Sequence, residues 1–197
     1  PCYKCQCCVA NKPEMCIKPG MIGSTVNGGY AEYVSVPATN VVVIPSNISY
    51  EEAASLPTVF LPCWSILLNR ANLKPWETVL ILSASSGVGT AAIQVAKNVI
   101  GSRVIATTSS NIKKQKALDL GADHVINYTK DNVLDTIGEL TNKRGVDVVV
   151  DHVGSEFWPE AMASLAPGGR YGICGVTTGY RAELQMGTLF VKQQTVL

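Results

Sequence analysis

The chain has 197 residues, of which 47% are hydrophobic and 16% are charged, and its net charge is +1. That composition is ordinary for a globular protein that buries an apolar core. The near-neutral charge offers no electrostatic fit to a nucleic-acid backbone, and no apolar run approaches the roughly 20 residues that cross a bilayer. We therefore expect no nucleic-acid partner and no membrane partner, and a cytoplasmic protein is the default interpretation.

Four of the seven cysteines follow the spacing C-x2-C-x2-C-x7-C, at Cys2, Cys5, Cys8 and Cys16. Four thiolates from one loop can meet at a tetrahedral centre, which is the arrangement of a closed structural Zn(II) site. Cys7 adjoins Cys8 and could replace it, so the ligand register stays open. Two disulfides are the alternative, although residues three apart bridge poorly. Because the chain opens at Pro1 inside this cluster and without Met, we expect a fragment whose preceding segment is missing.

The next stretch predicts short strands followed by helices. Residues 28–45 hold two β-like segments broken at Pro37, which predicts antiparallel strands. Ser49 and Glu52 form an S-x-x-E capping-box pattern that starts a short helix ending near Pro57. A second apolar helix is expected at about 63–71, and a domain boundary near residue 60.

Residues 78–97, TVLILSASSGVGTAAIQVAK, predict a strand, a tight turn and a helix. Gly87, Gly89 and Ala92 fill the pattern G-x-G-x-x-A, in which one glycine allows the turn, the next admits a pyrophosphate, and the third small residue lets helix and strand pack closely. The helix N-terminus would offer free N–H groups to phosphates. Small residues at such a turn also serve plain packing, so the motif alone leaves both interpretations open.

From this stretch onward, strands alternate with helices at the spacing of βαβ units, which predicts a parallel sheet covered on both faces. Strands are expected at 78–84, 103–109, 124–128, 146–153 and 170–175, with a sixth beginning near Thr195. Helices are expected near 88–100, 112–120, 131–141 and 159–165.

The end of the second predicted strand indicates which dinucleotide the fold would take. NAD-preferring folds place an acidic residue there, but residues 107–110 are Thr-Thr-Ser-Ser, and no acidic residue occurs between Glu77 and Asp119. Small hydroxyls leave room for a 2′-phosphate, and Lys113 could neutralise it. We therefore expect NADP(H) rather than NAD(H); the alternative is that the lysines of this helix are simply a solvated face.

Four features in order resemble the zinc-containing medium-chain dehydrogenase/reductases, the superfamily of alcohol dehydrogenases and quinone reductases: the four-cysteine loop, GGYAEY at 28–33, ASSGVGTAAIQ at 84–94 and LGADHVINY at 120–128. The resemblance covers nearly the whole chain. It implies an α/β fold, a Rossmann doubly wound parallel sheet at 61–197 that is truncated at its end. Residues 1–60 would be the later part of a GroES-like β domain, with a structural-zinc loop at 1–19.

The resemblance also implies residue roles. The structural-zinc ligands would be Cys2, Cys5, Cys8 and Cys16. The pyrophosphate turn would be formed by Gly87, Val88 and Gly89, and Thr108 would stand at the position that selects NAD in NAD-using relatives. The 2′-phosphate would be surrounded by Ser110, Lys113 and Tyr128. The cofactor ribose would contact His152 and Val153, and the nicotinamide would contact Val176. An ordinary strand-end histidine remains the alternative for His152.

One position departs from the family pattern. The third ligand of the family's catalytic zinc aligns with Thr58, and the first two come from a segment upstream of the cysteine loop. Because a neutral hydroxyl is a poor Zn(II) ligand, a second, catalytic zinc is either held differently or absent. Pro62 also stands where relatives often carry Thr near the nicotinamide.

The resemblance implies an oxidoreductase, active only in the intact chain, that transfers a hydride between NADP(H) and a small alcohol or aldehyde. A zinc-independent NADPH quinone or enone reductase is the alternative, since it needs no metal at Thr58. A zinc-stabilised cofactor-binding module without activity is a third possibility. A homo-oligomer, dimer or tetramer, is expected by analogy.

Overall fold

The computed structural model describes residues 1–197, which form two compact units, Pro1–Ile48 and Ser49–Leu197. The first unit contains three short helical turns: α1 (Gln6–Val9), η1 (Pro13–Met15) and η2 (Ala38–Asn40). Its β structure is one isolated bridge between Ile22 and Val26.

The antiparallel strands predicted within residues 28–45 are not formed, and that prediction is wrong for this structure. Val41, Val42 and Val43 are 60%, 84% and 88% exposed. Within this segment the only backbone amides that donate to other backbone groups are those of Asn40 and Val41, in the turn η2. A strand exists only when a neighbouring strand satisfies its backbone, so β-branched residues alone do not produce one.

The second unit begins with the predicted capping box. The Ser49 hydroxyl accepts from the Glu52 amide at 3.2 Å, and the Ser49 amide donates to Glu52 Oε2 at 2.8 Å. This box starts α2 (Tyr50–Ser55), which is followed at once by α3 (Pro57–Trp64) and its continuation η3 (Ser65–Arg70). The apolar helix predicted at 63–71 therefore begins earlier, because Pro57 suits a first helical turn. The division into domains at residues 60 and 61 stays a prediction.

The predicted parallel sheet is confirmed, with six strands in the order β3-β2-β1-β4-β5-β6. All five neighbouring pairs are parallel. The strands are β1 (Thr78–Ile81), β2 (Arg103–Thr108), β3 (His124–Asn127), β4 (Val146–Asp151), β5 (Leu165–Ile173) and β6 (Thr195–Val196). The strand order is that of a doubly wound dinucleotide-binding fold. β5 begins five residues earlier than predicted, at Leu165, and its pairing with β4 is irregular between Val146 and Val148.

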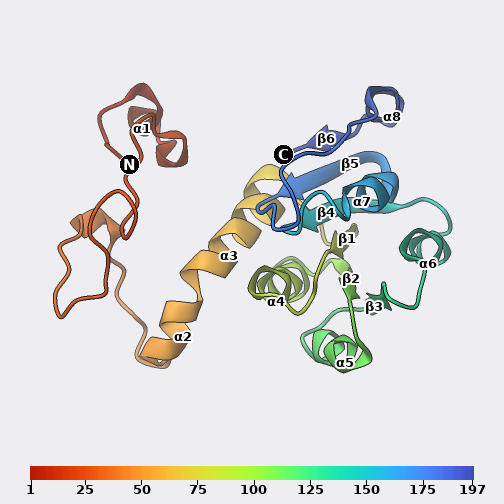
Figure 1. Ribbon diagram of the computed structural model, residues 1–197, viewed down its shortest axis with the longest axis horizontal. Coiled ribbons are helices and arrows are strands. Elements are labelled where there is room, and N and C mark those ends of the chain that lie inside the picture. Colours follow the sequence, from red (N-terminus) through yellow and green to blue (C-terminus); the bar gives the residue numbers. More distant parts are fainter. The chain divides into compact units, whose positions relative to one another are not determined.

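Helices cover both faces of the sheet (Figure 1). They are α4 (Gly87–Gln94) with its continuation η4 (Val95–Ile100), α5 (Asn111–Asp119), α6 (Val133–Leu140), α7 (Trp158–Ala163) and α8 (Met186–Val191). Alternate strand residues point to opposite faces: Val79 and Ile81 pack with α3, α4 and α5, whereas Leu80 and Leu82 pack with α6 and α7. Two apolar cores therefore hold the sheet, one on each face.

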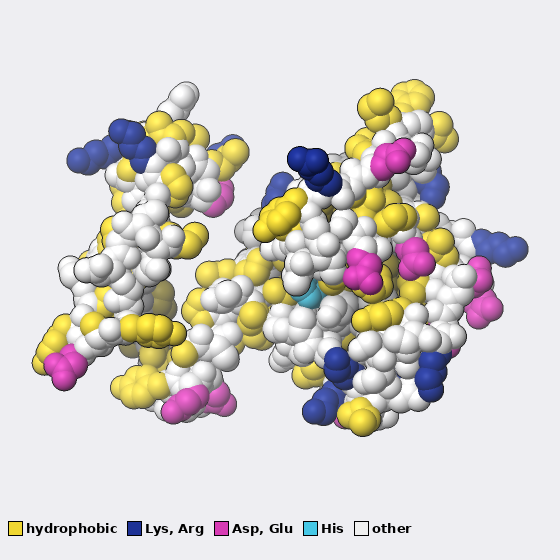
Figure 2. Space-filling model, viewed as in Figure 1, with side chains coloured by type: hydrophobic (Ala, Val, Ile, Leu, Met, Phe, Trp, Pro, Cys, Tyr) yellow, Lys and Arg dark blue, Asp and Glu magenta, His cyan; other side chains and the backbone are white.

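Helix α8 leaves apolar side chains in solvent. Met186, Phe190 and Val191 are 76%, 74% and 77% exposed, and hydrophobic side chains gather over this helix in Figure 2. Such a surface is typical of a contact site. No helix is long and apolar enough to cross a bilayer.

An ion pair ties three segments together at the amino edge of the sheet. The Arg170 guanidinium binds both carboxylate oxygens of Glu77, at 2.8 and 2.7 Å, and also donates to the Ala71 carbonyl at 2.9 and 3.1 Å. The two side chains are 20% and 15% exposed. Burial by itself raises the pKa of Glu77, but hydrogen bonds from Arg170 and the Lys74 amide outweigh it, so this pKa lies below its ordinary value.

We expect Glu77→Gln to destabilise the protein at neutral pH by about 1–3 kcal/mol, since Arg170 would keep its charge without its carboxylate partner. A carboxyl whose pKa is lowered by folding stabilises above its unfolded pKa, and this stabilisation is lost as pH falls through the folded value. Urea unfolding should therefore show a difference that shrinks as pH falls below about 4.

The matched control is Lys97→Gln, which breaks the Lys97–Asp123 pair, whose side chains are 35% and 31% exposed. It should cost less than about 1 kcal/mol because exposed pairs contribute little. An equal loss of unfolding free energy in the two variants would contradict this account, and so would a Glu77→Gln effect that is constant with pH.

Candidate functional site

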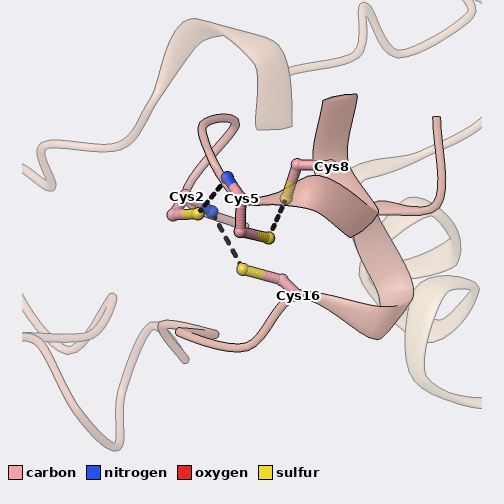
Figure 3. A group of neighbouring side chains, drawn as sticks. All are labelled: Cys2, Cys5, Cys8 and Cys16. Atoms are coloured by element: carbon pink, nitrogen blue, oxygen red, sulfur yellow. Dashed lines mark hydrogen bonds between the residues drawn. The ribbon is translucent and has the colours of Figure 1, made fainter. Parts of the chain in front are cut away.

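Four cysteine sulfurs converge in the first unit. Cys2, Cys5, Cys8 and Cys16 place their sulfur atoms within 4.8 Å of one another, and Figure 3 shows the four side chains turned toward a common centre. α1 begins just after Cys5 and carries Cys8, and η1 ends just before Cys16. In a tetrahedral zinc site with Zn–S bonds of about 2.3 Å, neighbouring sulfurs are about 3.8 Å apart. The spacing of this group therefore fits a Zn(II) ion.

Backbone amides point at these sulfurs. The Cys2 and Lys18 amides donate to Cys16 Sγ at 3.2 and 3.4 Å, and the Cys5 amide donates to Cys2 Sγ at 3.3 Å. Hydrogen bonds of this kind orient metal ligands. Amides at Cys8 and Ile17 lower the pKa of Cys5 to about 6, whereas loss of hydration raises the pKa of Cys8 to about 11. Four adjacent thiolates repel one another, so a cation is needed to keep all four ionised.

Cys7, the competing ligand, does not join the group. All seven cysteines are free thiols, and Cys5 Sγ and Cys8 Sγ are 3.5 Å apart, well beyond the roughly 2.05 Å of a disulfide bond. The geometry favours the register that uses Cys8. No second group of three or more His, Cys, Asp or Glu side chains converges elsewhere in the chain.

The glycine-bearing turn joins β1 to α4. Its left-handed residue is Ser83, with φ of 52°, so the turn does not depend on Gly87 as predicted. Gly89 is required by packing, since a Cβ there would collide with the Ser83 carbonyl and Ala84. The Ser86 hydroxyl caps the helix by accepting from the Gly89 amide at 2.8 Å. The first two amides of α4, at Gly87 and Val88, have no acceptor within the helix and are free for an anion.

The end of β2 lies beside this turn. The Ser83 amide donates to Thr107 Oγ1 at 3.1 Å, and the Ala84 amide donates to the Thr107 carbonyl at 2.8 Å. Thr108 follows; it is 1% exposed, and its hydroxyl has no hydrogen-bond partner. Hydrogen-bonding capacity is therefore unused at the strand end.

Three other predicted residues surround Thr108. Ser110 caps α5, accepting from the Lys113 amide at 3.4 Å, and Lys113 Nζ reaches Ser109 Oγ at 3.4 Å. The Tyr128 amide donates to the Thr108 carbonyl at 3.0 Å, and the Tyr128 ring meets Phe157 edge to face at 5.0 Å. This part of the site contains a lysine and hydroxyl groups.

The ends of β4 and β5 carry the remaining predicted residues. His152 directly follows β4 and is half-buried, and its Nδ1 has no partner. Burial lowers the pKa of His152, opposed by nearby Asp151, so the ring is neutral at physiological pH. The Thr178 amide and hydroxyl both donate to the Val153 carbonyl, at 2.7 and 2.9 Å, which ties this loop to the one that carries Val176.

Thr58 lies in the first turn of α3 and is exposed. The group of metal-ligating side chains that converges in this chain, Cys2, Cys5, Cys8 and Cys16, does not include it.

Sequence reasoning missed two features of the sheet's carboxyl edge. One is Asp151, a buried acid whose only signal was its place at the end of a strand, VDVVVD, that is apolar apart from Asp151 and Asp147. The other is a cavity of about 270 Å³ beside Asp151, Gly154, Val176, Gly179 and Tyr180. Most of its walls come from the loops after β4 and β5, so no sequence motif marks it.

Comparisons with known proteins agree with this geometry. Residues 87–197 match the family model described as zinc-binding dehydrogenase, and residues 2–46 match the alcohol dehydrogenase GroES-like domain. Quinone oxidoreductase-like protein 2 of Bos taurus is 34% identical over 177 residues, which are 90% of this chain and 51% of the relative.

Two solved structures are similar. A crystal structure of an NAD-dependent alcohol dehydrogenase has a TM-score of 0.93 and 38% identity. The match covers 100% of this chain and 57% of the dehydrogenase chain. The Escherichia coli quinone oxidoreductase complexed with NADPH has a TM-score of 0.72 and 32% identity. That match covers 79% of this chain and 48% of the oxidoreductase chain. The chain thus spans about half the length of these relatives.

The family match over more than half of the chain, the strand order and the cysteine group agree with one another. The chain belongs to the zinc-binding dehydrogenases of the medium-chain dehydrogenase/reductase superfamily.

Proposed function

We propose that this chain is the structural-zinc and cofactor-binding part of an oxidoreductase that transfers a hydride between NADP(H) and a small alcohol or aldehyde. The observation that carries the proposal is the carboxyl edge of the sheet. There the free amides of α4, the unpartnered Thr108 hydroxyl and the His152 ring lie on the adjacent strand ends of β1, β2 and β4. Open α/β sheets bind dinucleotides at this edge, where the strand order reverses.

Each group would have a distinct task. The amides of Gly87 and Val88, with the helix dipole behind them, would hold the pyrophosphate. The loops with His152, Val153 and Val176 would orient the ribose and nicotinamide ring. The bound cofactor supplies the hydride, so the protein contributes orientation and electrostatics. The division into a GroES-like part at 1–60 and a Rossmann part at 61–197 belongs to the same proposal.

The cysteine group is proposed to bind one structural Zn(II) through Cys2, Cys5, Cys8 and Cys16. The support is the mutual distance of 4.8 Å or less among the four sulfurs. Four protein ligands leave no open position, so such an ion would stabilise the first unit and take no part in chemistry.

We expect Cys8→Ser to lose this zinc, because a serine hydroxyl is a weak Zn(II) ligand beside thiolates. Cys7→Ser is the matched control, one residue away and outside the group; it should keep its zinc. Elemental analysis of the purified protein, with thermal unfolding before and after chelation, measures both. Zinc retained in Cys8→Ser and lost in Cys7→Ser would show that the ligand is Cys7.

The preference for NADP(H) over NAD(H) is proposed from this chain's own residues, since one similar structure is titled NAD-dependent and another contains NADPH. The end of β2 presents Ser109 and Ser110, and the exposed Lys113 follows one helical turn later. No carboxylate in this stretch would repel a 2′-phosphate. A lysine beside a phosphate provides a charge-assisted hydrogen bond.

We expect Lys113→Gln to lower kcat/KM for NADPH on the order of tenfold and to leave the value for NADH nearly unchanged. Lys116→Gln, another exposed lysine on α5, is the control and should change neither value. Both cofactors should be assayed with the full-length gene product. A wild-type enzyme that prefers NADH by a wide margin would contradict the proposed specificity.

The second candidate function is a zinc-independent NADPH quinone or enone reductase. The specific support is Thr58, an exposed neutral hydroxyl at the position that the family resemblance gives to a catalytic-zinc ligand, where a hydroxyl binds Zn(II) poorly. The similarity to quinone oxidoreductase-like protein 2 points the same way.

Zinc content separates the two functions. The alcohol dehydrogenase hypothesis expects two zinc ions per full-length subunit, one of them in the cysteine group, and turnover of alcohols or aldehydes that chelation abolishes. One zinc per subunit, with chelator-resistant reduction of quinones or enones by NADPH, would support the reductase. Tight NADPH binding without turnover of any of these substrates would indicate a non-catalytic module.

Assembly and location are part of the proposal. The exposed apolar face of α8 supports a homo-oligomer, dimer or tetramer. None of the seven cysteines forms a disulfide, which supports a reducing, cytoplasmic location.

A further inference from the structure

Asp151 is an acidic side chain enclosed at the carboxyl edge of the sheet. It is 1% exposed and ends β4, in which every residue is buried. A buried carboxylate is costly unless hydrogen bonds satisfy its oxygens. Its partners therefore indicate what the residue does.

One carboxylate oxygen closes the turn that follows β4. Asp151 Oδ1 accepts from the Val153 amide at 2.6 Å and from the Gly154 amide at 3.0 Å. Gly154 has a φ of +102°, a conformation that suits glycine. The carboxylate thus fixes the path of the backbone around His152 and Val153.

The other oxygen anchors this turn to β5. Asp151 Oδ2 accepts from the Tyr171 hydroxyl at 2.9 Å. Tyr171 is fully buried, and its ring packs against Trp158 of α7 at 4.8 Å. Burial and the adjacent carboxylate raise the pKa of Tyr171 far above its ordinary value, so the phenol remains a donor.

The turn after β4 also sets the position of the loop after β5. A Cβ at Gly154 would lie 2.8 Å from the Gly179 carbonyl and 2.9 Å from Val176 Cα, so the two loops touch. The hydrogen bonds from Thr178 to the Val153 carbonyl join them further. A displacement of the turn at Val153 would therefore be passed on to Val176.

We propose that Asp151 is a positioning residue that holds both of these loops in place before the cofactor binds. The inference rests on the proposed function, which assigns His152, Val153 and Val176 to the ribose and nicotinamide. Loops that are already ordered by the hydrogen bonds of Asp151 Oδ1 need no further ordering on binding.

Three variants separate the roles of the two carboxylate oxygens. Asp151→Ala removes the hydrogen bonds of both oxygens and should weaken NADPH binding to the full-length protein on the order of tenfold. Asp151→Asn keeps an acceptor oxygen for the two amides and should bind NADPH nearly as the wild type does. Tyr171→Phe removes only the anchor to β5; it should lower Tm and leave the Kd for NADPH near its wild-type value.

Fluorescence titration of NADPH, below the unfolding temperature of each variant, measures these Kd values. Unchanged affinity in Asp151→Ala, with normal wild-type binding, would overturn this inference alone. Failure of the wild type to bind either NADPH or NADH would overturn the proposed function and the inference with it.

Hydrogen exchange of the wild-type protein gives a second test that stands even if Asp151→Ala does not fold. The amides of Val153 and Gly154 should already be protected in the cofactor-free protein. Rapid exchange there, with protection only after NADPH is added, would show that the cofactor and not Asp151 orders the turn.

Discussion

The pairing of β1 with both β2 and β4 is the constraint on which the rest of the second unit depends. From this central strand the sheet extends through β2 and β3 in one direction and through β4, β5 and β6 in the other. The chain therefore crosses to opposite faces on the two sides of β1, and a crevice opens between the crossings. The glycine-bearing turn, Thr108 and His152 reach the same edge for this reason, although Gly87 and His152 are 65 positions apart in the sequence.

The two edges of the sheet have different chemistry. At the amino edge two ion pairs hold the strands: Arg170 binds Glu77, and Asp147 accepts from Arg144 at 2.6 Å and from the Thr78 amide at 2.8 Å. At the carboxyl edge Thr108 and His152 each retain an unpartnered buried atom. The ion pairs at the amino edge stabilise the fold, and the unused hydrogen-bonding capacity of Thr108 and His152 at the carboxyl edge is available to a ligand.

Features that depend on residues close together in the sequence were predictable from it. The capping box at Ser49, the cysteine spacing and the apolar strands with their intervening helices are of this kind. Two kinds of feature were not. Residues 28–45 have β-branched composition, but composition does not reveal whether a partner strand exists. The Asp151–Tyr171 contact joins residues 20 positions apart through the register of β4 on β5, which periodicity does not specify.

The two units also differ in how much chain must be present before each can form. The hydrogen bond from the Cys2 amide to Cys16 Sγ spans 14 positions, whereas the one from the Thr78 amide to the Asp147 carboxylate spans 69. Closing a short loop costs less entropy, and local contacts form sooner than distant ones. During synthesis from the N-terminus, the cysteine loop is complete long before β4 emerges. Until then β1 pairs only with β2. The edge of β1 that will pair with β4 is therefore open to association with other chains.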